Sequence, residues 1–451
     1  MSASALEGTS SRRRAAATLA AILVAPFGCA GGDDAGADDA SAGTTSAGAT
    51  ASAGTNWLDA CEFIGTGGYS LYDVALREFD DPPEAPRWRL ANATCETDWI
   101  HAIDITPSGV ICAAGHRALT DDTCDSTCPL TTSWIRCFSP GYEELWARSF
   151  DAGSVSIAAL ITTPDGEVVI AGARHDQAPP AEGYDGAPWI AAFDPAGSLL
   201  WEDAPPWSGA LRAVDRGDDG TLIAVGDVLV DGDKSDLFAA AYSPEGAELW
   251  TMTEDSAAYE AALGVAVDEL GRSWIVGARG EDPLASKLRA YSLGWGGTFR
   301  IGPYFSAETA LVALVDADGA LQWIEIPPTA DEFPFAWAAA VAHLPGGGVI
   351  VGGARKDDAD SLARYDADGA LLWTTTQTSE GITALRVDEA GDVFAVGSGC
   401  GCMLEIDPAD GEVVWKEPGL GSDAFALSPA GEPVIADYIA DGWFYPPWSR
   451  F

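Results

Sequence analysis

The stretch PDGEVVIAGARHDQAPPAEGYDGAPWIAAFDPAGSLLW, from Pro164 to Trp201, decides the fold. A Pro-Asp-Gly turn leads into the apolar run 167–172, a variable loop follows, and residues 189–193 form a second apolar run. An Asp-Pro-Ala-Gly turn then leads into a short segment that ends at Trp201. Runs of about five residues rich in Val, Ile, Phe and Trp, bounded by such turns, are too short for helices and predict β-strands. With the small apolar residues 159–163 in front, the unit contains four strands.

The same unit recurs along the chain. Its turn and second strand appear as PSGVICAAG, PDGEVVIAG, DDGTLIAVG, ELGRSWIVG, PGGGVIVGG, EAGDVFAVG and PAGEPVIAD, which begin at Pro107, Pro164, Asp218, Glu269, Pro345, Glu389 and Pro429. The tryptophan that ends the fourth strand, which we call the anchor tryptophan, recurs at Trp88, Trp146, Trp201, Trp250, Trp323, Trp373 and Trp415. Repeats of roughly 40 to 70 residues with several short strands are typical of β-propeller blades.

The two series are out of phase. Trp88 precedes the first turn element, and the last turn element, at Pro429, has no anchor tryptophan after it. Each end of the globular part therefore holds half a blade, and a ring closes by pairing such halves. The sequence predicts an all-β, seven-bladed β-propeller of four-stranded antiparallel blades, with the last blade shared between the N- and C-terminal strands. The strands of the shared blade are expected near Tyr69–Phe79, Arg87–Leu90, Ala424–Ser428 and Glu432–Ile439.

The N-terminus has the pattern of an export signal. Three arginines, 12–14, precede AAATLAAILVAPFG, an apolar stretch too short to span a bilayer but suited to a signal-peptide core. We therefore expect residues 1–28 to be a signal peptide. Cys29 follows Gly28 as in the bacterial lipobox, whose cysteine becomes lipid-modified, although the two residues before Gly28 depart from that pattern. The protein is expected in the cell envelope, lipid-anchored at the outer membrane or cell surface; ordinary cleavage after Ala30, giving a soluble secreted protein, is the alternative.

A low-complexity segment follows the signal. Residues 30–56 contain only Ala, Gly, Ser, Thr, Asp and one Asn, and such residues bury too little apolar area to fold. We expect 29–56 to be a disordered tether with a reach of roughly 30 Å. The remainder, 57–451, is expected to be one propeller domain, because each blade of a propeller packs on its neighbours as the ring grows.

The chain is strongly acidic, with a formal net charge of −45. Removal of residues 1–28 would leave 21 basic and 68 acidic residues, a net charge of −47. This charge excludes nucleic acid as a natural partner and disfavours an anionic membrane surface, so that membrane contact is expected only through the lipid anchor. Solubility is a sufficient reason for so many carboxylates.

Eight cysteines remain after Cys29, an even number that suggests disulfides in an exported chain. Cys112 and Cys137 fall on the second and third strands of one blade, which are antiparallel neighbours within reach of a disulfide. Cys124 and Cys128 could staple the loop between them. The others are Cys61 and Cys95, which could hold the N-terminal half-blade, and Cys400 and Cys402, a strained bridge or soft-metal pair at a hairpin tip. We expect no metal site.

Length variation is concentrated on one face of the predicted ring. Connections from the second to the third strand, and from the fourth strand to the next blade, emerge on the same face, and long loops on a rigid scaffold usually carry binding residues. The segment 279–309 is the longest of them and is rich in basic and aromatic residues. The candidate ligand or partner residues on this face are Lys287, Arg289, Tyr291, Trp295, Arg300, Tyr304, Trp207, Phe333 and Trp337. They could recognise a carboxylate, a glycan or an acidic strand of a partner, or the aromatics could simply pack the loops onto the ring.

Motifs for catalysis are absent from the sequence. It has no Gly-x-Ser-x-Gly elbow, no Walker loop and no His-Glu-x-x-His. The histidines His101 and His343 fall on first strands, and His116 and His175 begin loops, without a nucleophile at a familiar spacing. The run Asp231–Asp236 is similar to a Ca²⁺ loop, but Tyr242 stands where such a loop supplies its bidentate Glu.

The repeats DPAGSLLW, SPEGAELW and DADGALLW, each after a strand ending in Ala-Gly or Val-Gly, resemble the PQQ-like repeats of secreted bacterial propellers. The resemblance covers nearly all of 57–451. It implies the fold, and its lipoprotein members of the outer-membrane β-barrel assembly machinery imply a scaffold for protein contacts. Quinoprotein dehydrogenases of the family use eight blades and adjacent cysteines over the cofactor, whereas here Gly401 separates Cys400 from Cys402.

We therefore predict a non-catalytic, monomeric binding scaffold without a cofactor, whose partner is a protein, a small ligand or a glycan. The alternative is a propeller-type enzyme, either similar to quinoprotein dehydrogenases or a glycan lyase or hydrolase.

Overall fold

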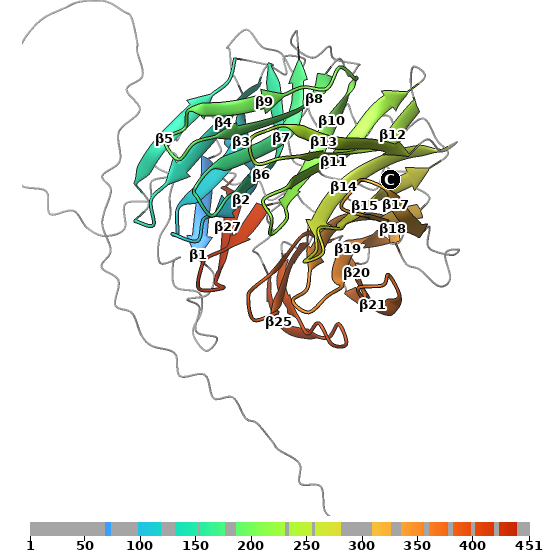
Figure 1. Ribbon diagram of the computed structural model, residues 1–451. Coiled ribbons are helices and arrows are strands. Elements are labelled where there is room, and N and C mark those ends of the chain that lie inside the picture. The colour runs from blue at the N-terminus through green and yellow to red at the C-terminus, as the bar shows by residue number, and fades with distance from the viewer. Residues whose placement is uncertain are drawn as a thin grey trace, which may run out of the picture.

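The chain forms an all-β propeller of four-stranded antiparallel blades in the computed structural model (Figure 1). The structure describes residues 68–73, 98–118, 131–141, 143–151, 154–175, 186–230, 234–254, 258–280, 309–325, 335–355, 360–377, 382–397, 402–418 and 424–439. Among these residues, none forms a helix long and apolar enough to cross a membrane.

Six blades have four strands each, and in every one the strands pair in the order of the sequence. The first three are β2(Asp98–Ile105), β3(Ile111–Ala118), β4(Thr131–Phe138), β5(Glu144–Ser149); β6(Val155–Thr162), β7(Val168–His175), β8(Gly186–Phe193), β9(Leu199–Asp203); and β10(Gly209–Arg216), β11(Leu222–Val230), β12(Lys234–Tyr242), β13(Glu248–Glu254). The next three are β14(Tyr259–Val267), β15(Ser273–Gly280), β16(Thr309–Val315), β17(Leu321–Glu325); β18(Phe335–His343), β19(Val349–Arg355), β20(Asp360–Tyr365), β21(Leu371–Gln377); and β22(Ile382–Val387), β23(Val393–Gly397), β24(Cys402–Ile406), β25(Val413–Pro418).

The two ends of the described chain meet in one further sheet. β1(Gly68–Asp73) pairs with β27(Pro433–Ile439), which pairs with β26(Ala424–Leu427). Figure 1 shows blue β1 beside red β27. The predicted sharing of a sheet between the two ends is confirmed. The described residues give six complete blades rather than the predicted seven, because the fourth strand expected for this sheet, 87–90, lies outside them.

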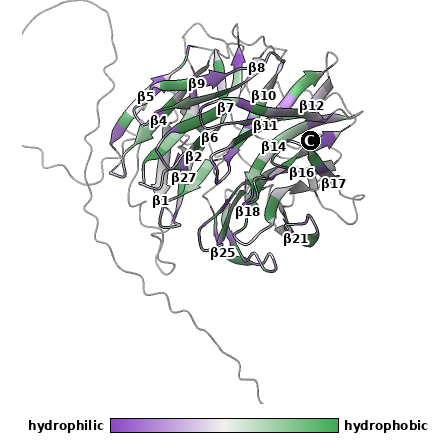
Figure 2. Cartoon of the chain, viewed as in Figure 1, coloured by the Kyte–Doolittle hydropathy of each residue, from purple (hydrophilic) through white to green (hydrophobic). Residues whose placement is uncertain are grey.

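The ring is closed by contacts between the innermost strands. Each of β2, β6, β10, β14, β18 and β22 contacts the innermost strand of the next blade, and β26 contacts β2. A closed ring gives every blade two packed faces, so strands within it are apolar on both sides. β7 illustrates this, since seven of its eight residues are buried, and green colouring follows it in Figure 2.

The core lies between blades. One cluster joins Val169 and Ala171 of β7 to Leu211 of β10 and Phe238 of β12. Equivalent clusters join the other neighbouring blades, so that stability comes from face-to-face stacking of sheets around the ring.

Gly226, a glycine within the second strand of the third blade, has a structural reason. In β10 the pairing with β11 passes from Leu211↔Gly226 to Ala213↔Val225, so Arg212 is the extra residue of a β-bulge. The bulge brings the backbone so close that a Cβ on Gly226 would lie 1.9 Å from the carbonyl oxygen of Ala210. Only glycine fits there. Gly172 and Gly277 make the same close approach, at 1.9 and 2.0 Å from a carbonyl oxygen, which explains the Ala-Gly or Val-Gly pair in these three repeats.

Five of the anchor tryptophans join their blade to the next. Each lies against the glycine in the turn between the third and fourth strands of the following blade. The pairs are Trp146–Gly197, Trp201–Gly246, Trp250–Gly319, Trp323–Gly369 and Trp373–Gly411. The indole Nε1 atoms of Trp201, Trp250 and Trp373 also donate hydrogen bonds to carbonyl groups of those turns.

Candidate functional site

The propeller has one face of short turns and one face of long connections. On the first face, five-residue turns such as 163–167 and 194–198 are closed by backbone hydrogen bonds of 2.9 and 2.8 Å. The second, which we call the loop face, carries the connections 176–185 and 281–308. This division agrees with the sequence prediction.

Three charged residues occupy the same position on three innermost strands. Asp104 on β2, Asp215 on β10 and Arg386 on β22 each lie two residues before the short turn that ends their strand. The four other innermost strands carry small or apolar residues at this position, namely Ile161, Ala266, Ala342 and Ala426. The charge of Arg386 acts on both aspartates, and that of Asp104 acts on Asp215. We call these three residues the axial cluster.

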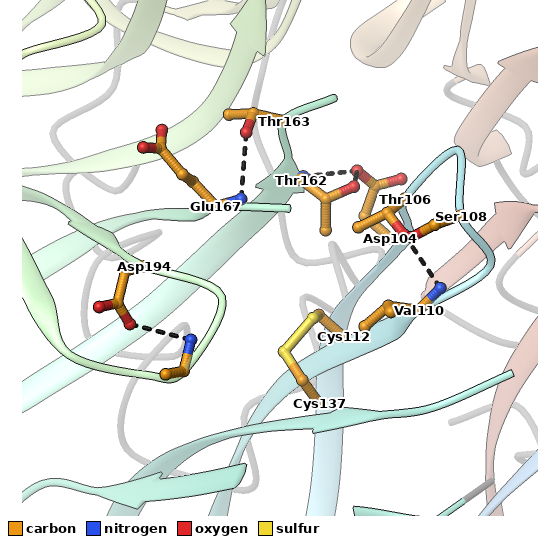
Figure 3. The surroundings of a disulfide bond; sticks show 11 residues. Asp104, Thr106, Ser108, Val110, Cys112, Cys137, Thr162, Thr163, Glu167 and Asp194 are labelled. Atoms are coloured by element: carbon orange, nitrogen blue, oxygen red, sulfur yellow. Dashed lines mark hydrogen bonds between the residues drawn. A yellow bond between two sulfur atoms is a disulfide. The ribbon is translucent and has the colours of Figure 1, made fainter. Parts of the chain in front are cut away.

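The two aspartates bridge neighbouring blades. Asp104 Oδ2 accepts hydrogen bonds from the backbone nitrogen of Thr162, at 2.7 Å, and from its hydroxyl, at 2.9 Å (Figure 3). Asp215 Oδ2 accepts one from the backbone nitrogen of Val267 at 2.8 Å. Both donors belong to the innermost strand of the following blade, where no further strand is available to pair with them. The aspartates therefore satisfy backbone groups that a sheet edge leaves open.

Burial changes the acid–base behaviour of this cluster. It raises the pKa of Asp215 to about 6, against the opposing effects of the hydrogen bond from Val267 and the charge of Arg386. It also raises the pKa of Asp104, where hydrogen bonds from Thr162 and the charge of Arg386 oppose the shift. Asp215 can thus exchange a proton near neutral pH, a property of catalytic acids and bases. Its Oδ2, however, is already engaged in a contact between blades.

Two ion pairs with buried carboxylates lie at the loop-face ends of blades three and four. Arg212 Nε contacts Asp227 Oδ1 at 2.6 Å, and Arg279 Nε contacts Glu260 Oε1 at 3.2 Å. Asp227 and Glu260 are each 1% exposed. Arg279 is the penultimate residue of β15, directly before the connection 281–308, so the second pair fixes the point where that connection begins.

An exposed aromatic residue marks the loop face between blades two and three. Trp207 is 39% exposed and lies edge-on against the buried ring of Phe238, with 5.1 Å between ring centroids. Its backbone nitrogen donates a hydrogen bond of 2.8 Å to the carbonyl oxygen of Pro205. At the adjacent end of blade two, Glu202 accepts a hydrogen bond from Trp189 Nε1 at 3.1 Å and pairs with Arg174 at 3.2 Å.

The predicted binding residues have different places. Trp207 is exposed on the loop face, whereas Trp337 lies in β18 and is only 6% exposed, so it packs inside the propeller instead of presenting a surface. Seven candidates lie outside the described residues: Lys287, Arg289, Tyr291, Trp295, Arg300, Tyr304 and Phe333.

The predicted disulfide between Cys112 and Cys137 is present, across the antiparallel pair β3–β4 (Figure 3). Cys402 is the first residue of β24. The remaining predicted cysteines lie outside the described residues, namely Cys29, Cys61, Cys95, Cys124, Cys128 and Cys400.

Two expectations about ligating residues need correction. His116 lies within β3 and His175 is the last residue of β7; both are buried rather than at loop surfaces. Asp236, placed by sequence in a possible Ca²⁺ loop, pairs with Val228 inside the β11–β12 ladder, because only residues 231–233 separate these strands. Within the described ranges, no three His, Cys, Asp or Glu side chains are grouped to hold a metal ion.

Sequence reasoning missed the axial cluster. Alignment of the innermost strands on their short turns would have found it, since Asp104, Asp215 and Arg386 then stand in a column of alanine and isoleucine. A charged residue in an otherwise apolar column is a signal of a special role.

Comparison with known proteins agrees with this architecture. Residues 308–442 match the family model described as outer membrane protein assembly factor BamB. This match and the fold support a PQQ-like β-propeller repeat protein. No curated protein matches the sequence.

Several solved structures are similar to this chain. A streptogramin B lyase has 9% identity and a TM-score of 0.49, with 82% of this chain and 98% of that chain covered. A virginiamycin B lyase from Staphylococcus aureus has 9% identity and a TM-score of 0.48, with 76% and 95% covered. A protein of unknown function from Bacteroides caccae has 12% identity and a TM-score of 0.37, with 69% and 94% covered. At this level the likeness says nothing about activity.

Proposed function

We propose that this protein is a non-catalytic, exported scaffold that binds a protein partner or a small ligand such as a glycan through its loop face. The observation that supports the proposal is Trp207, a partly exposed indole held edge-on against a buried phenylalanine. A large aromatic side chain that is both accessible and fixed in orientation loses little conformational entropy on binding. Such residues are enriched among those that dominate interface energies.

The use of polar residues elsewhere in the ring is consistent with a scaffold. Asp104 and Asp215 hold neighbouring blades together, and the pairs Arg212–Asp227 and Arg279–Glu260 lie at the base of the loop face. These contacts rigidify the platform on which the long connections stand. The family model that matches residues 308–442 is that of an assembly factor, and a protein partner is the corresponding expectation here.

The proposal includes an extracytoplasmic address. The disulfide between Cys112 and Cys137 is typical of an oxidising compartment. We assign residues 1–28 to a signal peptide, Cys29 to lipid attachment and 29–56 to a tether that carries the single domain 57–451. A Cys29→Ser variant should leave the membrane fraction and appear in the soluble extracytoplasmic fraction, whereas unchanged membrane fractionation of this variant would contradict lipid anchoring.

The proposal also includes a seventh complete blade. β26, β27 and β1 correspond to the first three strands of a blade, and the sequence supplies a fourth at 87–90, with Trp88 as its anchor. In the other blades the anchor tryptophan packs against the turn between the third and fourth strands of the next blade. Trp88 would therefore pack against the turn 139–143 of the first blade.

Binding can be tested with the mature protein as bait in extracts of the cell envelope. The variants are Trp207→Ala and a deletion of 284–308, and the control is Leu270→Ala. Leu270 is 70% exposed in a short turn on the opposite face, so it tests whether loss of any exposed apolar side chain has the same effect. Retention of a partner should fall at least tenfold in Trp207→Ala and remain unchanged in Leu270→Ala. Identical partners in equal amounts with all four proteins would refute the proposal.

A further inference from the structure

Two histidines of the first blade meet edge to edge, with their rings nearly coplanar. His101 on β2 and His116 on β3 have ring centroids 4.6 Å apart and ring planes inclined by only 15°. Nε2 of His101 and Nδ1 of His116 are in hydrogen-bond contact. His116 is 6% exposed, so the pair is part of the interior of the ring.

A β-bulge gives His101 this position. The pairing between β2 and β3 passes from Ile100↔Gly115 to Ala102↔Ala114, which leaves His101 as the extra residue. The same place on β10 is held by Arg212, which forms a buried ion pair. Bulges redirect a side chain and are frequent next to functional sites. His101 is therefore a polar residue at a position that the fold singles out.

Burial favours the neutral form of both rings. Burial lowers the pKa of His101 to about 4, and burial together with the neighbouring His101 lowers the pKa of His116 well below its usual value. A neutral imidazole has one nitrogen with a free electron pair, which is the form that binds metals. Because only one proton can lie between the two facing nitrogens, one of these nitrogens is an acceptor already.

We propose that His101 Nε2 and His116 Nδ1 form a binding site for a divalent transition-metal ion of the Cu²⁺ and Zn²⁺ class. The ion takes the place of the shared proton. The ring that carried this proton changes tautomer, so that each ring then holds its single proton on the nitrogen that faces away and no net proton is released. The two rings separate to admit the ion. Two imidazoles are fewer than the three or four protein ligands of most zinc sites, so water completes the coordination shell and Cu²⁺ binds more tightly than Zn²⁺.

Equilibrium dialysis of the mature protein against CuCl₂, and separately ZnCl₂, tests this site. We expect one Cu²⁺ per chain in the wild type, loss of that ion in His101→Gln and in His116→Gln, and its retention in His343→Gln. His343, on the innermost strand β18, is a control for removal of a ring histidine outside the pair. Electron paramagnetic resonance of the wild-type Cu²⁺ complex should show coupling to two nitrogens, a readout that needs no variant.

Absence of bound Cu²⁺ in the wild type, or equal binding by wild type and His101→Gln, would each overturn the proposal.

Discussion

The indole of Trp201 lies against Gly246 in the next blade, so closely that a Cβ on Gly246 would come within 2.3 Å of the ring. Trp201 Nε1 also donates a hydrogen bond of 3.0 Å to the carbonyl oxygen of Pro244, and its ring stacks on Tyr242. One side chain thus contacts a turn and a strand of the neighbouring blade. Five of the anchor tryptophans show the same relation to a turn glycine, so this is the repeated joint of the ring.

Gly246→Ala should destabilise the protein more than Gly391→Ala. Both glycines have a positive φ, 85° and 86°, so alanine costs about the same backbone strain at each. At Gly391 a Cβ would meet nothing within 4 Å, whereas at Gly246 it would displace Trp201. Urea denaturation of the two variants measures the difference, which we expect to be at least about 1 kcal/mol. Equal losses would mean that the tryptophan moves aside without cost.

Trp201→Ala should lower the free energy of unfolding by about 3–5 kcal/mol, because it removes the whole indole from the joint between two blades. Leu200→Ala is the matched control. Leu200 is the preceding residue and is 48% exposed, so its truncation should change stability by less than about 0.5 kcal/mol. Thermal unfolding followed by circular dichroism measures both. A Tm of Trp201→Ala equal to that of Leu200→Ala would show that the joint lies elsewhere.

Trp88→Ala tests the proposed completion of the seventh blade. If residues 87–90 form the outer strand beside β1, this substitution should destabilise the protein by the same 3–5 kcal/mol as Trp201→Ala. The measurement is again thermal unfolding of the mature chain. A Tm that matches the wild type would place Trp88 outside the joints of the ring and leave the shared sheet with three strands.

Asp215 should make the protein less stable as the pH rises. Its pKa is about 6 in the folded state and near 3.8 in the unfolded state, so the unfolded chain releases this proton at lower pH. The resulting loss in the free energy of unfolding is absent below about pH 4 and complete above about pH 6. It amounts to at most about 3 kcal/mol, reduced by whatever solvent reaches the carboxylate.

Asp215→Asn keeps an acceptor for the Val267 nitrogen but cannot ionise. This variant should therefore be more stable than the wild type at pH 7.5 and equal to it at pH 4, as measured by Tm at both pH values. Asp194→Asn is a control in which the pKa of the replaced carboxylate is shifted in the opposite direction. Asp194 lies in an exposed turn where backbone hydrogen bonds, first of all that from Ser198, lower its pKa, so its ionised form stabilises the fold and the variant should gain nothing at pH 7.5. A stabilised Asp194→Asn, or an Asp215→Asn without advantage at pH 7.5, would contradict this account.

The fold could be predicted to a large extent because its signals are local and repeated. The phase difference between Trp88 and Pro429 was sufficient to predict that β1 pairs with β27, although more than 350 residues separate them. The disulfide followed from the antiparallel neighbourhood of two strands. The axial cluster was not predicted, because no sequence motif marks Asp104 or Asp215. Only the ring of seven innermost strands brings them close to Arg386 and to each other. The prediction that Trp337 belongs to the binding face was wrong for a related reason. Whether its indole faces solvent or the core depends on where the loop ends and β18 begins.

Loss of the disulfide between Cys112 and Cys137 should destabilise the first blade. The bridge closes a segment with a sequence separation of 25, and constraint of the unfolded chain over such a loop contributes about 3–4 kcal/mol. A Cys112→Ala/Cys137→Ala double variant should therefore unfold at lower urea than the oxidised wild type, and its midpoint should not respond to a reductant. The wild type should lose the same stability when reduced. A midpoint of the wild type that stays constant under reduction, in protein shown by thiol titration to be fully reduced, would mean that burial of these two side chains stabilises the β3–β4 pair without the bond.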